Sequence, residues 1–253
     1  MKPFYTPATT TDPNRFTLAV QPHHCVGAPG ATFLMGGVQF AAIMSAMETV
    51  SDKPVIGATI QFISPGAPQG TADITINPIV NGRTIAQMQG SLLQEGRLVA
   101  FVTAALGQRP GIAPHQFAVM PETPTPEACD TRAPELPEDN TLMTLLERRS
   151  AFEDFDKGIN HIWFRSKNGA PTTAGQLAIM ADFLMGTHPK AHASPSLDNT
   201  FRVHALEQTE WVLAEMKIIY WGNGAVHGTV QLFSQRGTLL ASGNQSALMP
   251  RKG

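Results

Sequence analysis

A single carboxylate distinguishes two similar stretches of this 253-residue chain. Residues 195–203 repeat the apolar pattern of residues 54–62 at an offset of 141 positions, and Asp198 stands where the earlier stretch has Gly57. An ionised carboxylate in a strand with hydrophobic neighbours is costly unless it is hydrogen-bonded. Asp198 is therefore a candidate general base, whereas Gly57 could do no chemistry.

A single amide side chain also distinguishes the two copies further along the chain. Residues 235–241 repeat the frame of residues 94–100 at the same offset, and Gln245 then falls where the first copy has Ala104. The glutamine side chain brings two hydrogen-bond donors and one acceptor, and the alanine brings none. A carboxylate and an amide in only one copy predict a duplicated fold with one working site.

The repeat predicts two domains, because an internal period of this length is typical of tandem copies. In the first copy, Gly36-Gly37 opens a helix that is apolar on nearly every side and is therefore expected to be buried. Strand-like segments follow it. These segments are residues 55–63, 72–80, 84–93 and 98–106.

The second copy has a similar order of elements. We expect a short helix at residues 141–147, a strand at 160–166 and a second apolar helix at 173–185, and then strands at 196–204, 210–221, 225–234 and 239–248. One buried helix followed by an antiparallel meander indicates an α+β double hotdog. The predicted domains are an N-terminal hotdog (1–107), a Pro-rich linker without regular structure (108–140) and a C-terminal hotdog (141–253).

The composition excludes several classes of partner. A formal net charge of −2 gives no general attraction to nucleic acid or to anionic membranes. Cys25 and Cys129 are too far apart to form a metal motif or a disulfide framework. Residues 1–5 do not have the apolar core expected of a signal peptide, and no run of about 18 apolar residues is free of polar interruption. We expect a soluble cytoplasmic protein.

Two groups of histidines suggest a metal at first sight. His23 and His24 precede Cys25, but neighbouring strand residues point to opposite faces and cannot easily share an ion. His188 and His192 flank a proline in an expected loop, so they lack the helical geometry of a zinc pair. No metal site is predicted.

Several of these stretches, in order and spacing, resemble the acyl-CoA thioesterase II family, whose members are double hotdogs in one chain. They are residues 161–165, 181–183, 196–199, 210–213 and 237–241 with Gln245, and in the first copy Gly36-Gly37 and residues 64–66. The resemblance implies an acyl-CoA substrate, hydrolysis of its thioester, and no metal or organic cofactor. It places the protein in lipid metabolism.

In that family an Asp, a Thr or Ser, and a Gln hold the water that attacks the thioester. The resemblance assigns the first role to Asp198 and the third to Gln245. The hydroxyl is expected at residues 217–219, which contain none. In the first copy, Thr59 stands where the family tends to have a histidine, and we expect it to contact the substrate.

The expected mechanism uses Asp198 as the base and backbone N–H groups at Gly36 and Gly37 to face the oxyanion, with the helix dipole behind them. Asp182, on the second helix, is a secondary candidate, because some single-domain hotdog thioesterases use a helix carboxylate. Asp198 and Gln245 are expected to reach one shared water.

Two other functions stay open at this point. A non-catalytic protein that binds acyl-CoA or an acyl carrier would have the same tunnel without a held water, and the missing hydroxyl keeps this alternative open. A hydratase would normally carry a His shortly after the Asp, and residues 198–201 supply none. Homo-oligomerisation is compatible with the sequence, which does not specify acyl chain length.

Overall fold

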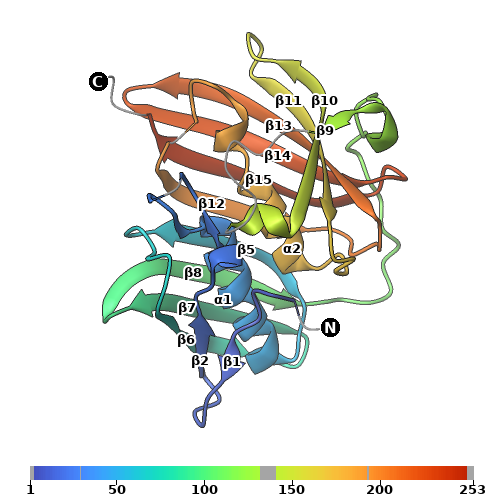
Figure 1. The fold of residues 1–253 in the computed structure, drawn as a ribbon. Helices are drawn as coiled ribbons and strands as arrows, with labels where there is room; N and C mark the ends of the chain where they lie inside the picture. The colour runs from blue at the N-terminus through green and yellow to red at the C-terminus, as the bar shows by residue number, and fades with distance from the viewer. Residues whose placement is uncertain (1–2, 29, 132–140, 193, 250–253) are drawn as a thin grey trace.

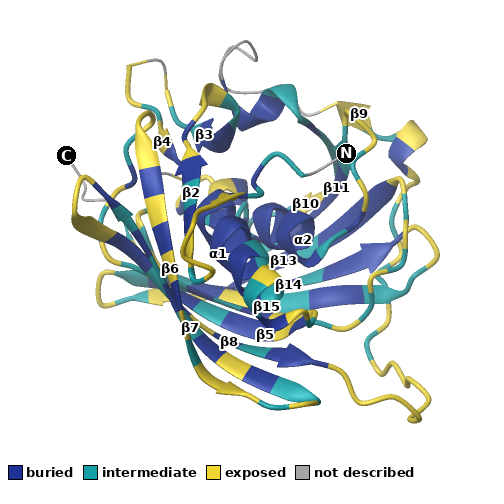
Figure 2. Ribbon diagram, turned by 90° about the horizontal axis from the view of Figure 1, so that it is seen from below, coloured by how far each residue is buried: buried dark blue, intermediate teal, exposed yellow. Residues whose placement is uncertain are grey.

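The computed structural model describes residues 3–28, 30–131, 141–192 and 194–249. Within these residues, thirteen strands form one antiparallel sheet in the order β1-β2-β6-β7-β8-β5-β12-β15-β14-β13-β11-β10-β9. The sheet curls around two helices, α1 and α2, which lie side by side on its inner face (Figures 1 and 2). This arrangement confirms the predicted double hotdog.

The first half contains one long helix and the first six strands in the order of the large sheet. Its elements are β1 (Ala8–Thr9), β2 (Arg15–Ala19), η1 (Pro22–His24), β3 (Cys25–Val26), β4 (Phe33–Leu34), α1 (Gly36–Ser51), β5 (Val55–Phe62), β6 (Thr71–Asn81), β7 (Ile85–Gln94) and β8 (Arg97–Gly107). Strands β3 and β4 pair separately as a small second sheet.

The second half repeats this plan around a shorter helix. Its elements are η2 (Pro126–Ala128), β9 (Asp130–Thr131), η4 (Leu142–Thr144), β10 (Leu146–Asp154), β11 (Ile159–Ser166), α2 (Ala174–Ala181), η5 (Met185–Thr187), β12 (Ser196–Val203), β13 (Trp211–Gly222), β14 (Ala225–Ser234) and β15 (Leu239–Leu248).

The hydrophobic pattern explains why the sheet curls around the helices. Strand β6 alternates buried and exposed residues over its first half, as a strand with one dry face must. Helix α1 is buried on nearly all sides because the sheet surrounds it and α2 packs against it. Figure 2 shows the buried residues gathered between the helices and the concave face of the sheet.

Tight turns with positive φ angles join two of the hairpins. Glu95 (φ 52°) with Gly96 (φ 74°) and Asn223 (φ 53°) with Gly224 (φ 78°) both have the positive φ angles of a two-residue hairpin turn. These turns fix the register of β7 against β8 and of β13 against β14.

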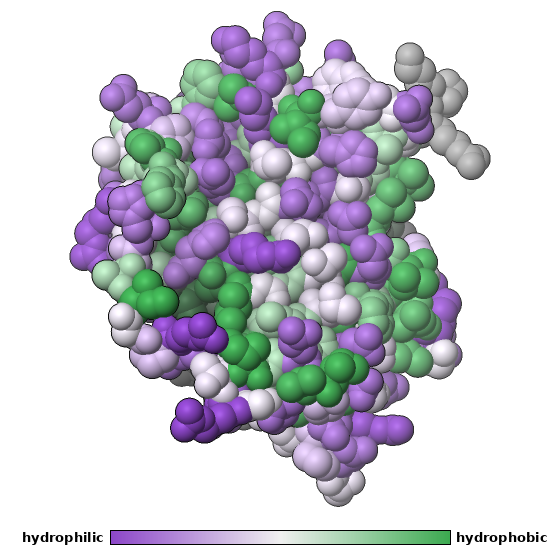
Figure 3. Space-filling view, turned by 180° about the vertical axis from the view of Figure 1, so that it is seen from behind, coloured by the Kyte–Doolittle hydropathy of each residue, from purple (hydrophilic) through white to green (hydrophobic). Residues whose placement is uncertain are grey.

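The two halves are joined through the middle of the sheet. Strand β5 of the first half pairs antiparallel with β12 of the second, from Gly57 opposite Arg202 to Gln61 opposite Asp198. The inner residues of both strands face the helices, and the outer residues face the back of the molecule. That back face mixes hydrophilic side chains with smaller hydrophobic groups (Figure 3).

Two predicted helices differ from the structure. Residues 142–144 form only a 3₁₀ turn, capped by the Thr141 hydroxyl, which accepts from the N–H of Met143, because pairing with β11 then draws the chain into β10. The second helix ends at Ala181 and not near residue 185. After it, i→i+3 hydrogen bonds from Phe183 and Leu184 tighten the chain into a 3₁₀ path.

Part of the expected linker is attached to the second half. Trp163 donates from Nε1 to the carbonyl of Pro124 (2.9 Å), and Arg149 donates to the carbonyl of Pro126 (2.8 Å). Strand β9 pairs with β10 and adds the last strand to the sheet. Residues 108–131, the described part of the predicted linker, have little regular structure and cover a cluster of Trp163, Trp211, Leu213 and Phe233, while residues 132–140 lie outside the described residues.

Candidate active site

The carboxylate of Asp182 lies where the two helices meet. Asp182 is the C-cap of α2, and its Oδ2 accepts from the N–H of Gly37 near the start of α1 (2.6 Å). A Cβ atom added at Gly37 would lie 2.9 Å from both Asp182 Cβ and Ile179 Cα. Only glycine allows this close approach, so the sequence of α1 decides how the carboxylate is held.

Gln245 connects the carboxylate to a hydroxyl. Its Nε2 donates to Asp182 Oδ1 (2.9 Å) and to Ser196 Oγ (2.8 Å), which uses both amide protons. The Ser196 hydroxyl keeps its own proton for donation elsewhere. Gln245 Oε1 is buried and has no partner within the described residues. Asp182, Ser196 and Gln245 thus form one hydrogen-bonded group.

Asn199 completes the buried side of this group. It is the direct cross-strand neighbour of Gln245 on β15 and is 2% exposed. Its amide lies near the Asp182 carboxylate and lowers the pKa of that group. Nothing in the sequence pattern had marked this residue as functional.

The surroundings raise the pKa of Asp182 to about 7, well above the usual range of an aspartate. Desolvation by the surrounding protein is the main cause, and the hydrogen bonds from Gly37 and Gln245, together with the nearby amide of Asn199, oppose it. The residue keeps partial exposure to solvent. A carboxylate with a pKa near neutrality, reachable from solvent, is suited to general base catalysis.

Asp198 lies on the other face of the sheet. Its cross-strand partners are Gln61 and Ser246, and its Oδ1 accepts from the N–H of Ser246 (3.2 Å). Successive strand residues point to opposite faces, so Asp198 points away from the face that holds Asn199 and Gln245. The structure therefore does not bring Asp198 and Gln245 together, and the expected pair around one water does not form.

Thr59 shares the outer face with Asp198. Its hydroxyl lies 3.3 Å from the hydroxyl of Thr200, its cross-strand partner on β12. The inner neighbours of these two residues are Ile60 and Asn199, which both point toward the helices. Thr59 thus lies on the opposite face of the sheet from the Asp182 carboxylate.

The glycine pair at the start of α1 adjoins the carboxylate, although its role differs from the expected one. The Gly37 N–H is bonded to Asp182 and does not stand open for an oxyanion. A Cβ atom at Gly36 would lie 2.7 Å from the Phe62 ring and 3.1 Å from Asp182 Oδ2. Gly36 therefore provides a gap between an aromatic wall and the carboxylate.

The hydroxyl that was expected on β13 comes from β12. On β13, Ile218 is buried, while Lys217 and Ile219 are exposed. Ser196 supplies the hydroxyl at the first position of β12, where the pairing with β15 shifts between Ser196 and Asp198. Because of this shift, the side chains of Ser196 and Asn199 both lie on the face of the sheet that carries Gln245.

The other candidate positions do not form a site. Among the described residues, no group of three or more His, Cys, Asp or Glu side chains could hold a metal ion. His24 lies against the carbonyl of Phe4, and His188 against that of Phe155. None of the helices in the described ranges is long and apolar enough to span a membrane.

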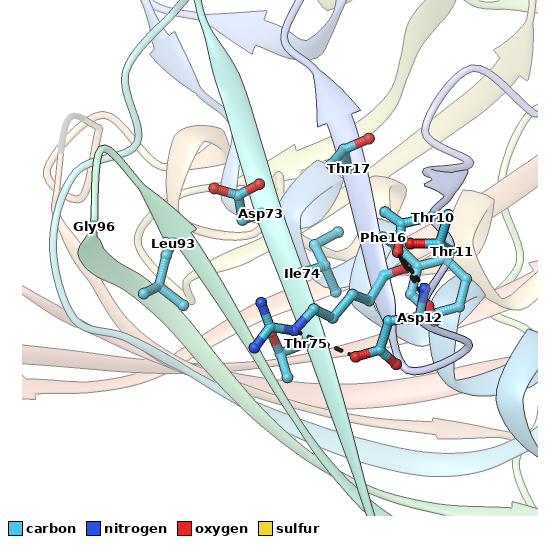
Figure 4. A pocket seen from close by; sticks show the side chains of 11 residues that line it. Thr10, Thr11, Asp12, Phe16, Thr17, Asp73, Ile74, Thr75, Leu93 and Gly96 are labelled. Carbon is cyan, nitrogen blue, oxygen red and sulfur yellow. Dashed lines mark hydrogen bonds and ion pairs between the residues drawn. The ribbon is translucent and has the colours of Figure 1, made fainter.

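A separate groove of about 640 Å³ lies at the edge of the first half, between β2, β6 and the end of β7 (Figure 4). Its charged residues include Asp73 and the ion pair of Arg15 with Asp12 (3.5 Å). None of the residues of the Asp182 group lines it.

Models of two protein-family domains match most of the chain. The acyl-CoA thioesterase N-terminal domain matches residues 27–107, and the acyl-CoA thioesterase C-terminal domain matches residues 116–249. The second match begins before the predicted C-terminal hotdog and includes the segment that packs on its outer face. No curated protein sequence matches this chain significantly.

Solved structures share the whole fold. A candidate thioesterase from Novosphingobium aromaticivorans is 32% identical, with a TM-score of 0.90 over 96% of this chain and 98% of that one. A candidate thioesterase II from Thermobifida fusca is 19% identical, with a TM-score of 0.84 over 98% of both chains. The acyl-CoA thioesterase II TesB2 from Mycobacterium marinum is 17% identical, with a TM-score of 0.79 over 99% and 98%.

Proposed function

Because this chain belongs to the acyl-CoA thioesterase family, we propose that it hydrolyses acyl-CoA thioesters to the free acid and CoA, with Asp182 as the general base. One observation carries the assignment of residues: Asp182, Ser196 and Gln245 converge in one hydrogen-bonded group at the start of α1. In this proposal they take the roles of the Asp, the hydroxyl and the Gln that hold water in the family, with Asp182 in place of Asp198.

The first step is attack by a water molecule held beside Asp182. The water oxygen bonds to the thioester carbonyl carbon while its proton passes to the carboxylate, which is positioned by Gly37 and Gln245. The carbonyl oxygen becomes an oxyanion. The free proton of the Ser196 hydroxyl and the N-terminal end of the α1 dipole are available to stabilise that charge.

The second step breaks the carbon–sulfur bond. The tetrahedral intermediate collapses to the carboxylic acid, the bonding electrons leave with the sulfur, and protonated Asp182 returns the proton to the thiolate. This restores the carboxylate for the next turnover. The reaction consumes only water, and the Asp182 carboxylate carries the transferred proton from the water to the thiolate.

Asp198 is the competing base, and its environment argues against it. It accepts a hydrogen bond from the backbone of Ser246 on the outer face, and the side-chain hydrogen bonds of Gln245 go to Asp182 and Ser196. Asp182, in contrast, accepts a hydrogen bond from Gln245, and its pKa is near neutrality. The missing hydroxyl was the argument for a non-catalytic binding protein. Ser196 now provides a hydroxyl, so this argument no longer applies.

A panel of purified acyl-CoAs, from acetyl to palmitoyl, tests the proposal through thiol release followed with a thiol reagent. We expect turnover with at least one chain length and its loss in Asp182→Asn. Release of CoA that survives unchanged in Asp182→Asn and stops in Asp198→Asn would transfer the base to Asp198. Binding without release for every acyl group would instead favour the acyl-CoA or acyl-carrier binding protein.

The setting of the reaction follows from its substrate. We propose a cytoplasmic enzyme of lipid metabolism, supported by the acyl-CoA family and by two cysteines that are both free. Self-association is part of the same proposal, and size-exclusion chromatography with light scattering measures it directly.

A further inference from the structure

The N-terminal strap, which we define as residues 3–7, covers the start of the second helix. Its Tyr5 is 3% exposed, and the phenol contacts the hydroxyl of Thr173, the N-cap of α2. A Cβ atom added at Gly175 would lie 2.5 Å from the Tyr5 ring, so the ring rests directly on the helix backbone. Beside it, Gln176 is 3% exposed, and its Nε2 has no partner among the described residues. The strap thus buries a polar helix start.

A single histidine fastens the strap. The carbonyl oxygen of Phe4 lies 3.0 Å from His24 Nε2, and the Phe4 ring stacks on the imidazole with 5.8 Å between centroids. The other ring nitrogen, Nδ1, lies 3.0 Å from the N–H of Gln21, which precedes the 3₁₀ turn η1. His24 is 2% exposed, so solvent does not compete for either bond. The imidazole therefore joins the strap to η1.

These two partners fix the protonation state of the ring. The Phe4 carbonyl can only accept, so Nε2 of His24 carries a proton. The Gln21 N–H can only donate, so Nδ1 carries none. A second proton would place an N–H at Nδ1 against that N–H and would bring a charge into a buried place. The fastened strap therefore requires a neutral imidazole.

Four other titratable groups lie around the strap and its histidine. The His23 ring on η1 lies 4.4 Å from that of His24, Cys25 follows on β3, and Glu48 of α1 acts on Tyr5. The turn η4, which packs against η1, has no charged side chain. Burial raises the pKa of Tyr5 to about 12 and that of Cys25 to about 11, so both stay neutral in acid. Burial also lowers the pKa of both histidines and raises the pKa of Glu48, so these three groups can respond to acid.

We propose that His24 is a pH-sensitive latch: the neutral imidazole fastens the N-terminal strap over the start of α2, and its protonation releases the strap. Release would expose the Thr173 hydroxyl and the Gln176 amide. His23 does not fill this role, because it meets the strap only through an edge-to-face contact with the Phe4 ring. The inference is independent of the proposed thioesterase function.

Amide hydrogen exchange followed by NMR tests the latch without any substrate. The reporters are the Gln21 N–H, which donates to His24, and the Thr6 N–H, which donates to the Pro3 carbonyl within the strap. A released histidine titrates near pH 6.5, so the open fraction should rise about tenfold from pH 7.5 to pH 5.5. Exchange at both reporters, corrected for its intrinsic pH dependence, should rise by that factor. The Ile76 N–H in β6 is the internal reference and should not change.

The variant His24→Gln removes the titrating group and keeps a side chain that can make one of the two hydrogen bonds. We expect faster exchange than in the wild type at pH 7.5, because one bond is lost, and no tenfold rise at pH 5.5. His23→Gln and Glu48→Gln are the matched controls, since each removes another group that responds to acid, and both should keep the tenfold rise. Circular dichroism checks that each variant is folded.

Nitrogen-15 NMR of the histidine rings tests the latch in the wild type alone, whether or not the variants fold. At pH 7.5 we expect His24 to carry its proton on Nε2 only. A proton on Nδ1, or equal exchange at pH 7.5 and pH 5.5 in both reporters, would overturn the inference. It would also be overturned if the pH effect disappeared in His23→Gln or Glu48→Gln and persisted in His24→Gln.

Discussion

The same pair of positions carries alanines in one half of the molecule and amides in the other. Ala58 pairs with Ala104 across β5 and β8, and Asn199 pairs with Gln245 across β12 and β15. Both pairs face the helices at equivalent places in the sheet. The first half therefore has a closed hydrocarbon surface where the second presents four polar atoms.

The two helix starts differ as well. The start of α1 receives the Asp182 carboxylate, whereas the start of α2 is covered by Tyr5, whose hydroxyl contacts that of Thr173. A Cβ atom at Gly175 would lie 2.5 Å from the Tyr5 ring. Burial raises the pKa of Tyr5 to about 12, so the phenol stays neutral. One helix start is thus available for chemistry, and the other is closed by the N-terminal segment.

This contrast shows that duplication alone does not produce two sites. A site needs a helix start, a carboxylate from the neighbouring helix and an amide pair on the sheet, and only one end of the α1–α2 pair has all three. The following changes would either abolish the difference between the halves or show that it is irrelevant.

The largest effect is expected for Asp182→Asn. The asparagine can still accept from the Gly37 N–H through its oxygen, but it cannot take a proton from water. We expect kcat to fall by about 10²-fold or more with KM nearly unchanged, measured by thiol release. Asp198→Asn is the matched control from the outer face, and a comparable loss there would show that the base has been misassigned.

Gln245→Ala makes the second half a copy of the first at this position. The change removes both hydrogen bonds that link the carboxylate to Ser196, so we expect kcat to fall by about 10- to 10²-fold. The reciprocal Ala104→Gln should add no activity, because the first half lacks a carboxylate beside it. A second active site created by Ala104→Gln would contradict the comparison.

The pH dependence of kcat/KM follows from the raised pKa of Asp182. The base is active when ionised, so the rate should fall about tenfold for each pH unit below about 7. A profile flat from pH 5 to 8 would exclude Asp182 as the base.

Protein stability should depend on pH in the opposite direction. The folded protein binds a proton at Asp182 that the unfolded chain releases near pH 4, so this group favours folding at low pH and loses that contribution as pH rises through about 7. Asp182→Asn should therefore raise Tm more at pH 8 than at pH 5. Calorimetry at the two pH values measures the difference, and equal shifts would show that burial of this carboxylate costs nothing.

The smallest effect is expected for Tyr5→Phe, which keeps the ring over the start of α2 and removes its hydroxyl. The loss of one hydrogen bond should lower the free energy of unfolding by about 1 kcal/mol. Activity should change less than twofold, because Tyr5 covers the helix start that lacks the carboxylate. Urea denaturation gives the first quantity, and a large loss of activity would mean that both helix starts take part.

The strands were predictable from the sequence because each has one dry face and clear turn residues. The boundaries of β6, β7 and β13 differ from prediction by one residue at each end, and those of β14 agree with it. The prediction of a short helix at residues 141–147 was wrong, because pairing with β11 draws the chain into strand β10. Helix periodicity alone cannot show that a neighbouring strand is available.

The site was only partly predictable, and the reason is strand parity. Asn199 and the buried Phe201 lie on one face, which places Asp198 and Thr200 on the other. That alternation was readable from the sequence. The shift in pairing that brings Ser196 to Gln245 was not, because it depends on the register with β15. The contact of Asp182 with Gly37 was not predictable either, because it depends on how the two helices pack.

The pairing of β5 with β12 has a further consequence for how this protein can evolve. Two identical subunits joined at this edge would carry every mutation twice, so any polar residue useful at one site would also be buried at its twin. Fusion of the copies in one chain allows each half to mutate independently. One half can then keep a hydrophobic interior that stabilises the fold, while the other accumulates the destabilising buried charge that chemistry requires.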